Sequence, residues 1–232
     1  MIIPFSDDNP LKYIAFQRVT VSLIIINTLI FVIFQSGIIP SPDQEMFLAY
    51  AIVPKELITG QNVFINVVSW PEGFTLFTYM FLHGGWLHLI FNMIFLWVFG
   101  DNIEDAMGHS RFLVFYLCTG IAAGMVYTLV SSENNAPLIG ASGAIAGVTG
   151  AYLMLYPRVK IWALLFMRVP LRLKAMWVLG AWFAFQIFSA LTGDTSNIAW
   201  WAHIGGFVAG AALVVLFKRP SVPLFGAAPP SS

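Results

Sequence analysis

The sequence predicts an all-α polytopic membrane protein, a six-transmembrane-helix bundle with a long, partly embedded first outer loop. Three observations predict this fold class. Of the 232 residues, 59% are hydrophobic and only 9% are charged, whereas soluble domains carry roughly 25% charged residues. The apolar residues gather in six uncharged runs, and nearly all lysines and arginines fall on one side of these runs. We therefore expect residues 19–217 to form one membrane domain.

Each uncharged run supplies one helix. The runs lie at about 19–36, 74–100, 112–130, 138–156, 175–192 and 198–217. A helix needs roughly 20 residues to cross a hydrocarbon core of about 30 Å, so the second run is longer than one crossing needs. We expect the second helix to begin near Trp86. The loop before it, residues 37–73, should rest partly in the bilayer through its apolar side chains, Phe47, Phe64, Val67, Val68 and Trp70.

The positions of lysine and arginine orient the six helices. An even number of crossings leaves both termini on one side, and the side richer in these residues is normally cytoplasmic. With a cytoplasmic N-terminus, only Lys55 lies outside. The basic residues left inside are Lys12, Arg18, Arg111, Arg158, Lys160, Arg168, Arg172, Lys174, Lys218 and Arg219. We expect a prokaryotic plasma membrane protein with a cytoplasmic segment at 1–18 and a disordered cytoplasmic tail at 218–232, where four prolines disfavour a helix.

Composition and motif content argue against several other kinds of function. The formal net charge is zero, so no nucleic-acid partner is expected. No HExxH zinc motif is present, and His83 and His88 are five residues apart, so we expect no metal site and no organic cofactor. A proton or ion relay needs buried carboxylates. An ion transporter is disfavoured because no acidic residue lies in any of the six runs.

Four polar residues at membrane depth come together at one end of the predicted bundle. His88 and Asn92 are four apart and share one helix face. His203 lies about five residues into the sixth run. Pro137 and Gly140 disfavour helix, so the fourth helix should begin near Ser142 with its N-terminus below the outer surface. Other polar residues at depth, to which the sequence gives no role, are Asn27, Gln186 and Ser189.

These residue types suit acyl transfer. A serine needs a base to become a nucleophile, and His203 is the candidate base for Ser142. The backbone N–H of Ser142, at a helix N-terminus, and the side chains of His88 and Asn92 are candidate donors to an oxyanion. No acidic residue at depth can orient His203, so a Ser-His dyad is expected.

Close helix packing is the alternative interpretation of the same stretch. Gly143 and Gly147 form a small-xxx-small pattern, as do Gly206 and Gly210. Such patterns bring membrane helices together without any chemistry. The two interpretations are compatible, because close helices also allow a serine and a histidine to meet.

Four motifs together resemble the rhomboid intramembrane serine proteases. They are HLIFN at 88–92, EDAMGHSR at 104–111, GASG at 140–143 and AHIGGFVAG at 202–210, in that order, and the resemblance covers about residues 10–218. It implies that Ser142 is the nucleophile, His203 the base, and His88 and Asn92 oxyanion donors. It also implies that Gly206 and Gly210 pack the fourth and sixth helices, and that Glu104 and Arg111 belong to a structural loop motif.

The resemblance implies a serine endopeptidase that cleaves transmembrane proteins in or near their membrane-spanning segments. Many relatives carry an aromatic residue one turn after the serine, beneath the histidine, but this chain has Ala146 there. Another side chain must therefore support His203. Inactive relatives typically lack the serine or the histidine, and this chain keeps both. A non-catalytic protein that binds membrane clients remains the alternative.

Overall fold

The structure is a computed structural model that describes residues 2–38, 49–61, 71–133, 135–165, 168–193 and 198–226. Its long helices are α1 (Arg18–Ile30), continued by the π-helical turn η1 (Phe31–Gln35), α4 (Trp86–Met107), α5 (His109–Val130), α6 (Ser142–Leu155), α7 (Ala175–Leu191) and α8 (Trp200–Phe217). Shorter elements are α2 (Pro54–Thr59), α3 (Glu72–Thr78) and the 3-10 turn η3 (Tyr79–Phe81). The strands are β1 (Ile2–Asp7), β2 (Lys160–Leu165) and β3 (Val169–Lys174).

Most of the described chain is helical, and its long helices are apolar. Among the described residues, four helical stretches are long and apolar enough to cross a membrane: Arg18–Gln35, α4, α5 and α8. The apolar helices α6 and α7 are shorter, with 14 and 17 residues. Helix α4 begins at Trp86 and α6 at Ser142, where the sequence predicted the two starts. Of the loop expected at 37–73, residues 39–48 and 62–70, with all five of its named apolar side chains, lie outside the described residues.

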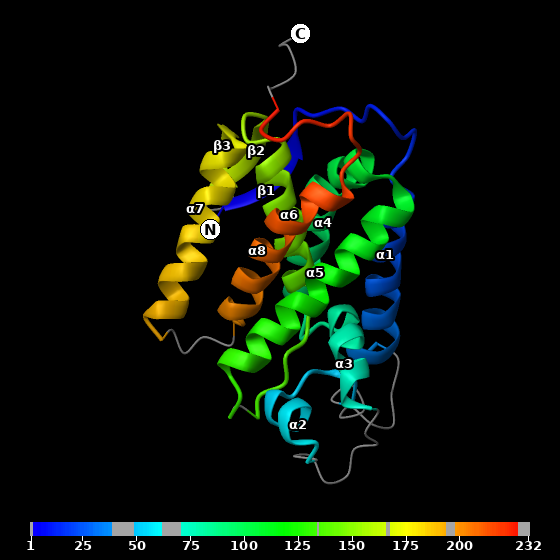
Figure 1. The fold of residues 1–232 in the computed structure, drawn as a ribbon, viewed down its shortest axis with the longest axis vertical. Helices are drawn as coiled ribbons and strands as arrows, with labels where there is room; N and C mark the ends of the chain where they lie inside the picture. Colours follow the sequence, from blue (N-terminus) through cyan, green and yellow to red (C-terminus); the bar gives the residue numbers. More distant parts are fainter. Residues whose placement is uncertain are drawn as a thin grey trace.

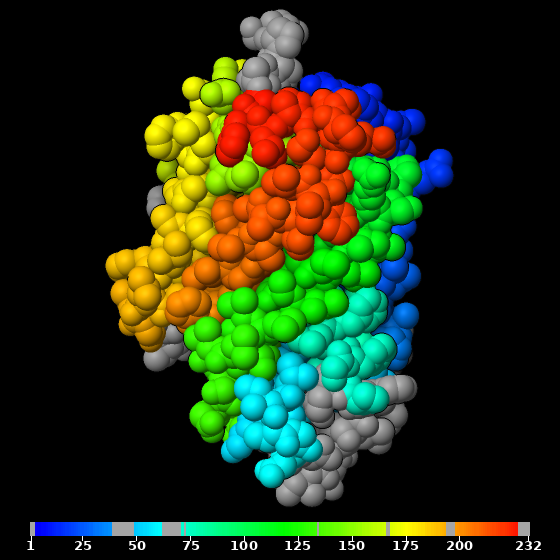
Figure 2. Space-filling view, viewed as in Figure 1, coloured from blue at the N-terminus to red at the C-terminus, as the bar shows by residue number. Residues whose placement is uncertain are grey.

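Helix α6 occupies the centre of the bundle. It packs against α4, α5, α7 and α8, and Figure 1 shows it enclosed by them. Eleven of its residues are buried, most of them glycine, alanine or threonine. Figure 2 shows α8 crossing the visible face diagonally between α7 and α5. A central helix with small side chains lets its neighbours come close on every side.

Glycines set the contact between α6 and α8. A methyl group on Gly206 would overlap the carbonyl oxygen of Gly143, and one on Gly210 would overlap that of Gly147. A methyl group on Gly150 would likewise overlap the carbonyl oxygen of Phe207. The two backbones therefore touch over about two turns of helix, which larger side chains would prevent.

A small β-sheet at one end of the bundle corrects the all-α prediction. Strand β1 pairs antiparallel with β2, and β2 pairs antiparallel with β3. Within β2, Ile161 and Ala163 are buried while Lys160 is exposed, the alternation typical of a strand with one covered face. We call this end of the bundle the sheet end; α2 and α3 lie at the opposite end (Figure 1).

Residues 218–226, part of the tail expected at 218–232, pack against the end of α6. The N–H groups of Phe225 and Gly226 donate to the carbonyl oxygens of Met154 and Leu155 at 2.8 and 3.0 Å, and Val222 is buried. The last carbonyls of a helix lack partners within the helix. Here the tail supplies partners to α6, although it forms no helix itself. Residues 227–232 lie outside the described residues.

Candidate active site

An irregular turn delivers Ser142 to the start of α6, at the end of the bundle opposite the sheet. Gly140 has a φ of +123°, which side chains disfavour. Its N–H donates to the carbonyl oxygen of Tyr79 at 2.9 Å. Leu138 exchanges two backbone hydrogen bonds with Ile52. Non-helical backbone at membrane depth is tolerated where protein satisfies it, and these contacts do so.

Ser142 and His203 meet across the contact between α6 and α8. The His203 Nε2 atom lies 2.8 Å from Ser142 Oγ, within hydrogen-bonding distance. The other ring nitrogen, Nδ1, lies 2.7 Å from Oε1 of Gln186 on α7. Both Ser142 and His203 are partly exposed, whereas Gln186 is only 4% exposed. The arrangement can carry a proton from the hydroxyl to the imidazole.

His88 borders the serine from α4. A methyl group on Gly140 would come 2.8 Å from His88 Nε2 and 3.8 Å from Ser142 Oγ. The Gly84 N–H donates to His88 Nδ1 at 3.4 Å, which leaves Nε2 as the ring nitrogen that carries a proton. His88 therefore presents a donor beside the turn that precedes Ser142.

Further candidate donors lie near this end of the site. Asn92, one turn along α4 from His88, is 7% exposed, and its Nδ2 has no hydrogen-bond partner among the described residues. The first N–H groups of α6 donate no hydrogen bond to the side chain of the N-cap residue, Ala141. Free N–H groups at a helix N-terminus favour negative charge. These groups have the chemistry that an oxyanion requires.

Two tryptophans flank His203 in place of the aromatic residue missing at Ala146. The Trp182 and His203 ring centroids are 6.0 Å apart with an interplanar angle of 35°. Trp200 meets the same ring edge-on, at 6.3 Å and 86°. The imidazole is therefore supported from α7 and from the first turn of α8 rather than from α6.

Sequence reasoning missed Gln186 and Trp182 as parts of this site. The face of α7 on which they stand is covered by the bundle, which the almost uniformly apolar sequence of this helix does not reveal. Its buried residues are Ala175, Val178, Leu179, Gln186 and Ser189. Phe185 and Phe188, in contrast, are 56% and 64% exposed. A glutamine four residues from a tryptophan on the covered face points into the bundle.

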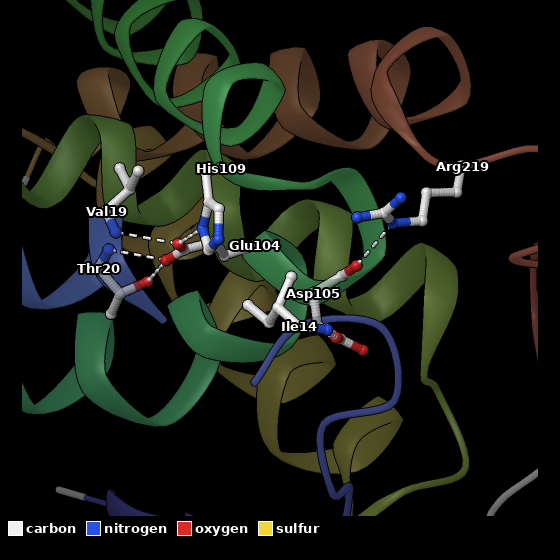
Figure 3. Close-up of polar contacts among 7 residues, drawn as sticks. All are labelled: Ile14, Val19, Thr20, Glu104, Asp105, His109 and Arg219. Carbon is white, nitrogen blue, oxygen red and sulfur yellow. Dashed lines mark hydrogen bonds and ion pairs between the residues drawn. The ribbon is translucent and has the colours of Figure 1, made fainter. Parts of the chain in front are cut away.

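Glu104 and Asp105 form a second polar cluster, at the sheet end of α4 (Figure 3). Glu104 is fully buried, and its two carboxylate oxygens accept the N–H groups of Val19 and Thr20 at 2.9 and 2.8 Å. The His109 Nδ1 atom lies 2.5 Å from Glu104 Oε1. Asp105 accepts three N–H groups from residues 12–14. The Glu104 contacts cap the start of α1, as a structural role for Glu104 requires, and the Asp105 contacts hold the segment before α1. Arg111 is exposed.

Comparison with known proteins gives one family. The Rhomboid domain profile matches residues 71–220. The chain is 31% identical over 156 residues to RHOMBOID-like protein 5 of Arabidopsis thaliana, covering 67% of this chain and 48% of that protein. It is 31% identical over 161 residues to Rhomboid protease GluP of Bacillus subtilis (strain 168), covering 69% of this chain and 29% of that protein.

A third relative, Rhomboid protease GlpG of Yersinia pseudotuberculosis serotype I (strain IP32953), is 25% identical over 183 residues, covering 76% of this chain and 62% of that protein. The matches thus span half or less of the first two relatives' own length. The family profile matches more than half of this chain and includes all four motifs that carry the resemblance. The chain belongs to the rhomboid family, and its long apolar helices are those of an integral membrane protein.

Proposed function

We propose that this protein is an intramembrane serine endopeptidase that hydrolyses peptide bonds in or near the transmembrane segments of other membrane proteins. Ser142 is the nucleophile and His203 the general base. The observation that carries the proposal is the 2.8 Å separation of His203 Nε2 and Ser142 Oγ at the uncapped start of α6. Relatives that bear the name rhomboid protease support it.

The reaction follows from the positions of these groups. His203 Nε2 accepts the Ser142 proton while Oγ attacks the carbonyl carbon of the scissile bond. The resulting oxyanion accepts hydrogen bonds from the N–H groups at the start of α6 and from His88 and Asn92. His203 then gives its proton to the leaving amine. In the second half of the reaction His203 takes a proton from water, which attacks the acyl carbon, and returns that proton to Ser142 Oγ as the ester bond breaks.

The membrane placement belongs to the same proposal. The four long helices and the shorter α6 and α7 each cross the bilayer once. The sheet end is cytoplasmic because ten of the eleven basic residues lie on elements at that end or beside them. Ser142 consequently opens toward the outer side. A substrate helix must unwind there, because an intact helix hides its carbonyl groups in hydrogen bonds.

A fluorophosphonate probe and a panel of transmembrane peptides test this function. Purified wild type in detergent or liposomes is compared with Ser142→Ala, His203→Ala and the control Ser189→Ala, which removes a buried hydroxyl from α7. We expect labelling and cleavage by the wild type and the control, and neither by the other two variants. Folded wild type that neither labels nor cuts would favour the client-binding alternative. Cleavage by Ser142→Ala would instead show that Ser142 is not the nucleophile.

A further inference from the structure

We infer that Gln186 is a positioning residue for His203, so that the working unit is Ser142–His203–Gln186 rather than a dyad. The inference rests on the function proposed above and deepens it. Its starting point is that both ring nitrogens of His203 have partners, at 2.8 Å on the Ser142 side and 2.7 Å on the Gln186 side. A residue that hydrogen-bonds to Nδ1 determines whether Nε2 carries a proton, and so whether Nε2 can act as a base.

The glutamine oxygen selects the tautomer of the imidazole. A neutral imidazole carries one proton, on Nδ1 or on Nε2, and a carbonyl oxygen can only accept. The Gln186 Oε1 atom at 2.7 Å therefore holds the proton on Nδ1. Nε2 is left with a free lone pair directed at Ser142 Oγ, which a general base requires.

The burial of Gln186 indicates that its hydrogen bond to His203 has a function. Gln186 is 4% exposed on a helix whose neighbouring large side chains, Phe185 and Ile187, face outward. A buried amide in a membrane helix costs free energy unless it is hydrogen-bonded. An apolar side chain would fill the same place without that cost, so a glutamine here is best explained by the bond to His203.

An amide also suits this location better than a carboxylate. Helices α6, α7 and α8 contain no aspartate or glutamate. While His203 is neutral, a carboxylate here would be an unpaired charge at depth, which carries a large desolvation cost. Glutamine fixes the tautomer with a neutral dipole, and that dipole also stabilises the imidazolium that forms when Ser142 attacks.

Trp182 completes the support of the ring. It lies four residues before Gln186, on the same covered face of α7, with its ring centroid 6.0 Å from that of His203. Gln186 thus holds one edge of the imidazole while Trp182 covers a face. Helix α7 fixes both the tautomer and the orientation of a base carried by α8.

The test compares Gln186→Leu, Gln186→Glu and the control Ser189→Ala, one turn further along the same buried face. Cleavage of a transmembrane peptide is measured across pH, together with the rate of fluorophosphonate labelling. We expect Gln186→Leu to lower kcat roughly 10- to 100-fold, the usual effect of losing a group that orients a histidine, with little change in KM. Ser189→Ala should behave like the wild type.

Gln186→Glu separates positioning from mere packing. It keeps the acceptor, so we expect most of the rate to return. The added carboxylate favours protonated His203, so the acidic limb of the pH–rate profile should move to higher pH. The pH–rate profile of Gln186→Glu remains decisive even if Gln186→Leu fails to fold. A profile identical to that of the wild type, or full activity in folded Gln186→Leu, would overturn the inference while leaving the role of Ser142 intact. Activity in Ser142→Ala would instead overturn the proposed function itself.

Discussion

Asn92 and Glu104 are both buried on α4, yet their hydrogen bonding differs. The carboxylate of Glu104 accepts from Val19, Thr20 and His109 at the sheet end. Asn92 keeps an Nδ2 donor without an acceptor among the described residues, near the opposite end. Buried donors are normally paired, and an unpaired one costs stability. The contrast fits a structural role for Glu104 and a donor role for Asn92 that is fulfilled only during the reaction.

Replacing Asn92 tests this reading at a single residue. If Nδ2 donates to the oxyanion in the transition state, Asn92→Ala should lower kcat by about 10² to 10³, with KM nearly unchanged. The measurement is steady-state cleavage of a transmembrane peptide by purified protein. An unpaired buried donor destabilises the folded state, so removing it should offset the cost of the cavity that the smaller side chain leaves. The unfolding temperature of Asn92→Ala should therefore not fall below that of the wild type.

Asn27→Ala is the matched control for Asn92→Ala. Asn27 is fully buried on α1, and its Nδ2 donates to the Leu23 carbonyl oxygen at 2.8 Å. Its Oδ1 also lacks a partner among the residues that the structure describes. Asn27→Ala should therefore change the unfolding temperature and leave kcat unchanged. Equal rate losses in the two variants would mean that any buried asparagine matters through folding, and the donor role would be abandoned.

At the level of helices, the backbone contact between α6 and α8 sets the distance between Ser142 and His203. Gly206→Ala places a methyl group against the Gly143 carbonyl oxygen, so the helices must separate. We expect a stability loss of about 1–3 kcal/mol, as for other overpacked sites, and a larger loss of cleavage, because the Ser–His hydrogen bond lengthens. Thermal unfolding in detergent and peptide cleavage give the two quantities.

Gly180→Ala supplies the comparison for Gly206→Ala. Gly180 lies within α7, and a methyl group there would meet no atom of the described residues within 4 Å. Alanine is favoured over glycine inside a helix by roughly 0.5–1 kcal/mol. Gly180→Ala should therefore unfold at the same or a higher temperature and cut normally. If Gly206→Ala also did so, close packing of α6 and α8 would not limit the reaction.

Asp7, the last residue of strand β1, contacts α6 near the end opposite Ser142. Tyr152 on α6 donates its hydroxyl to Asp7 Oδ2 at 2.5 Å, and the Asn9 N–H donates to Asp7 Oδ1 at 3.2 Å. Burial raises the pKa of Asp7 from 3.8 to about 7, and Asp101 adds to the rise although the Tyr152 hydroxyl opposes it. The folded protein thus favours the neutral acid.

The sign of the resulting pH dependence follows from this raised pKa. Below about pH 4 Asp7 is protonated in both the folded and unfolded states, and as the pH rises toward about 7 only the unfolded state loses its proton. Stability should therefore fall over this range and level off above it. Asp7→Asn keeps an acceptor for Tyr152 but removes the titration. In thermal unfolding at several pH values, the unfolding temperature of Asp7→Asn relative to that of the wild type should rise from pH 4 to 7. A difference that does not change with pH would contradict the raised pKa of Asp7.

The sequence predicted the helices well because each rests on a local signal. The start of α6 followed from Pro137 and Gly140, and that of α4 from the excess length of its apolar run. The sheet was missed because β1 pairs with residues about 160 positions away, and a single sequence does not reveal which distant segments pair. The contact between Gln186 and His203 was missed because it depends on how α7 rotates against α8.

For the whole molecule, the distribution of charge gives the sharpest expectation. Lys160, Arg172 and Lys174 lie in the sheet, and Arg219 lies against the end of α4. Lys55, in contrast, lies on α2, at the other end. Positive residues near membrane helices remain on the cytoplasmic side. The sheet end should therefore face the cytoplasm and the Ser142 end the outside.

Single cysteines can report the side of each loop, because Cys118 is the chain's only natural one. In a Cys118→Ala background we would place a cysteine at Gln61, Arg168 or Ser221, which are all exposed. A membrane-impermeant maleimide added to intact cells should label the Gln61→Cys protein. It should label the Arg168→Cys and Ser221→Cys proteins only after the membrane is permeabilised.

Arg168 distinguishes six crossings from four. It lies between α6 and α7, the apolar helices of 14 and 17 residues. If both cross the bilayer, three crossings separate Arg168 from Gln61, and the two sites lie on opposite sides. If neither crosses, two crossings separate them, and both label from outside, whereas Ser221 stays inside in either case. Labelling of Arg168→Cys and Ser221→Cys but not Gln61→Cys in intact cells would invert the orientation, and with it the side to which Ser142 opens; the Cys118→Ala parent should remain unlabelled throughout.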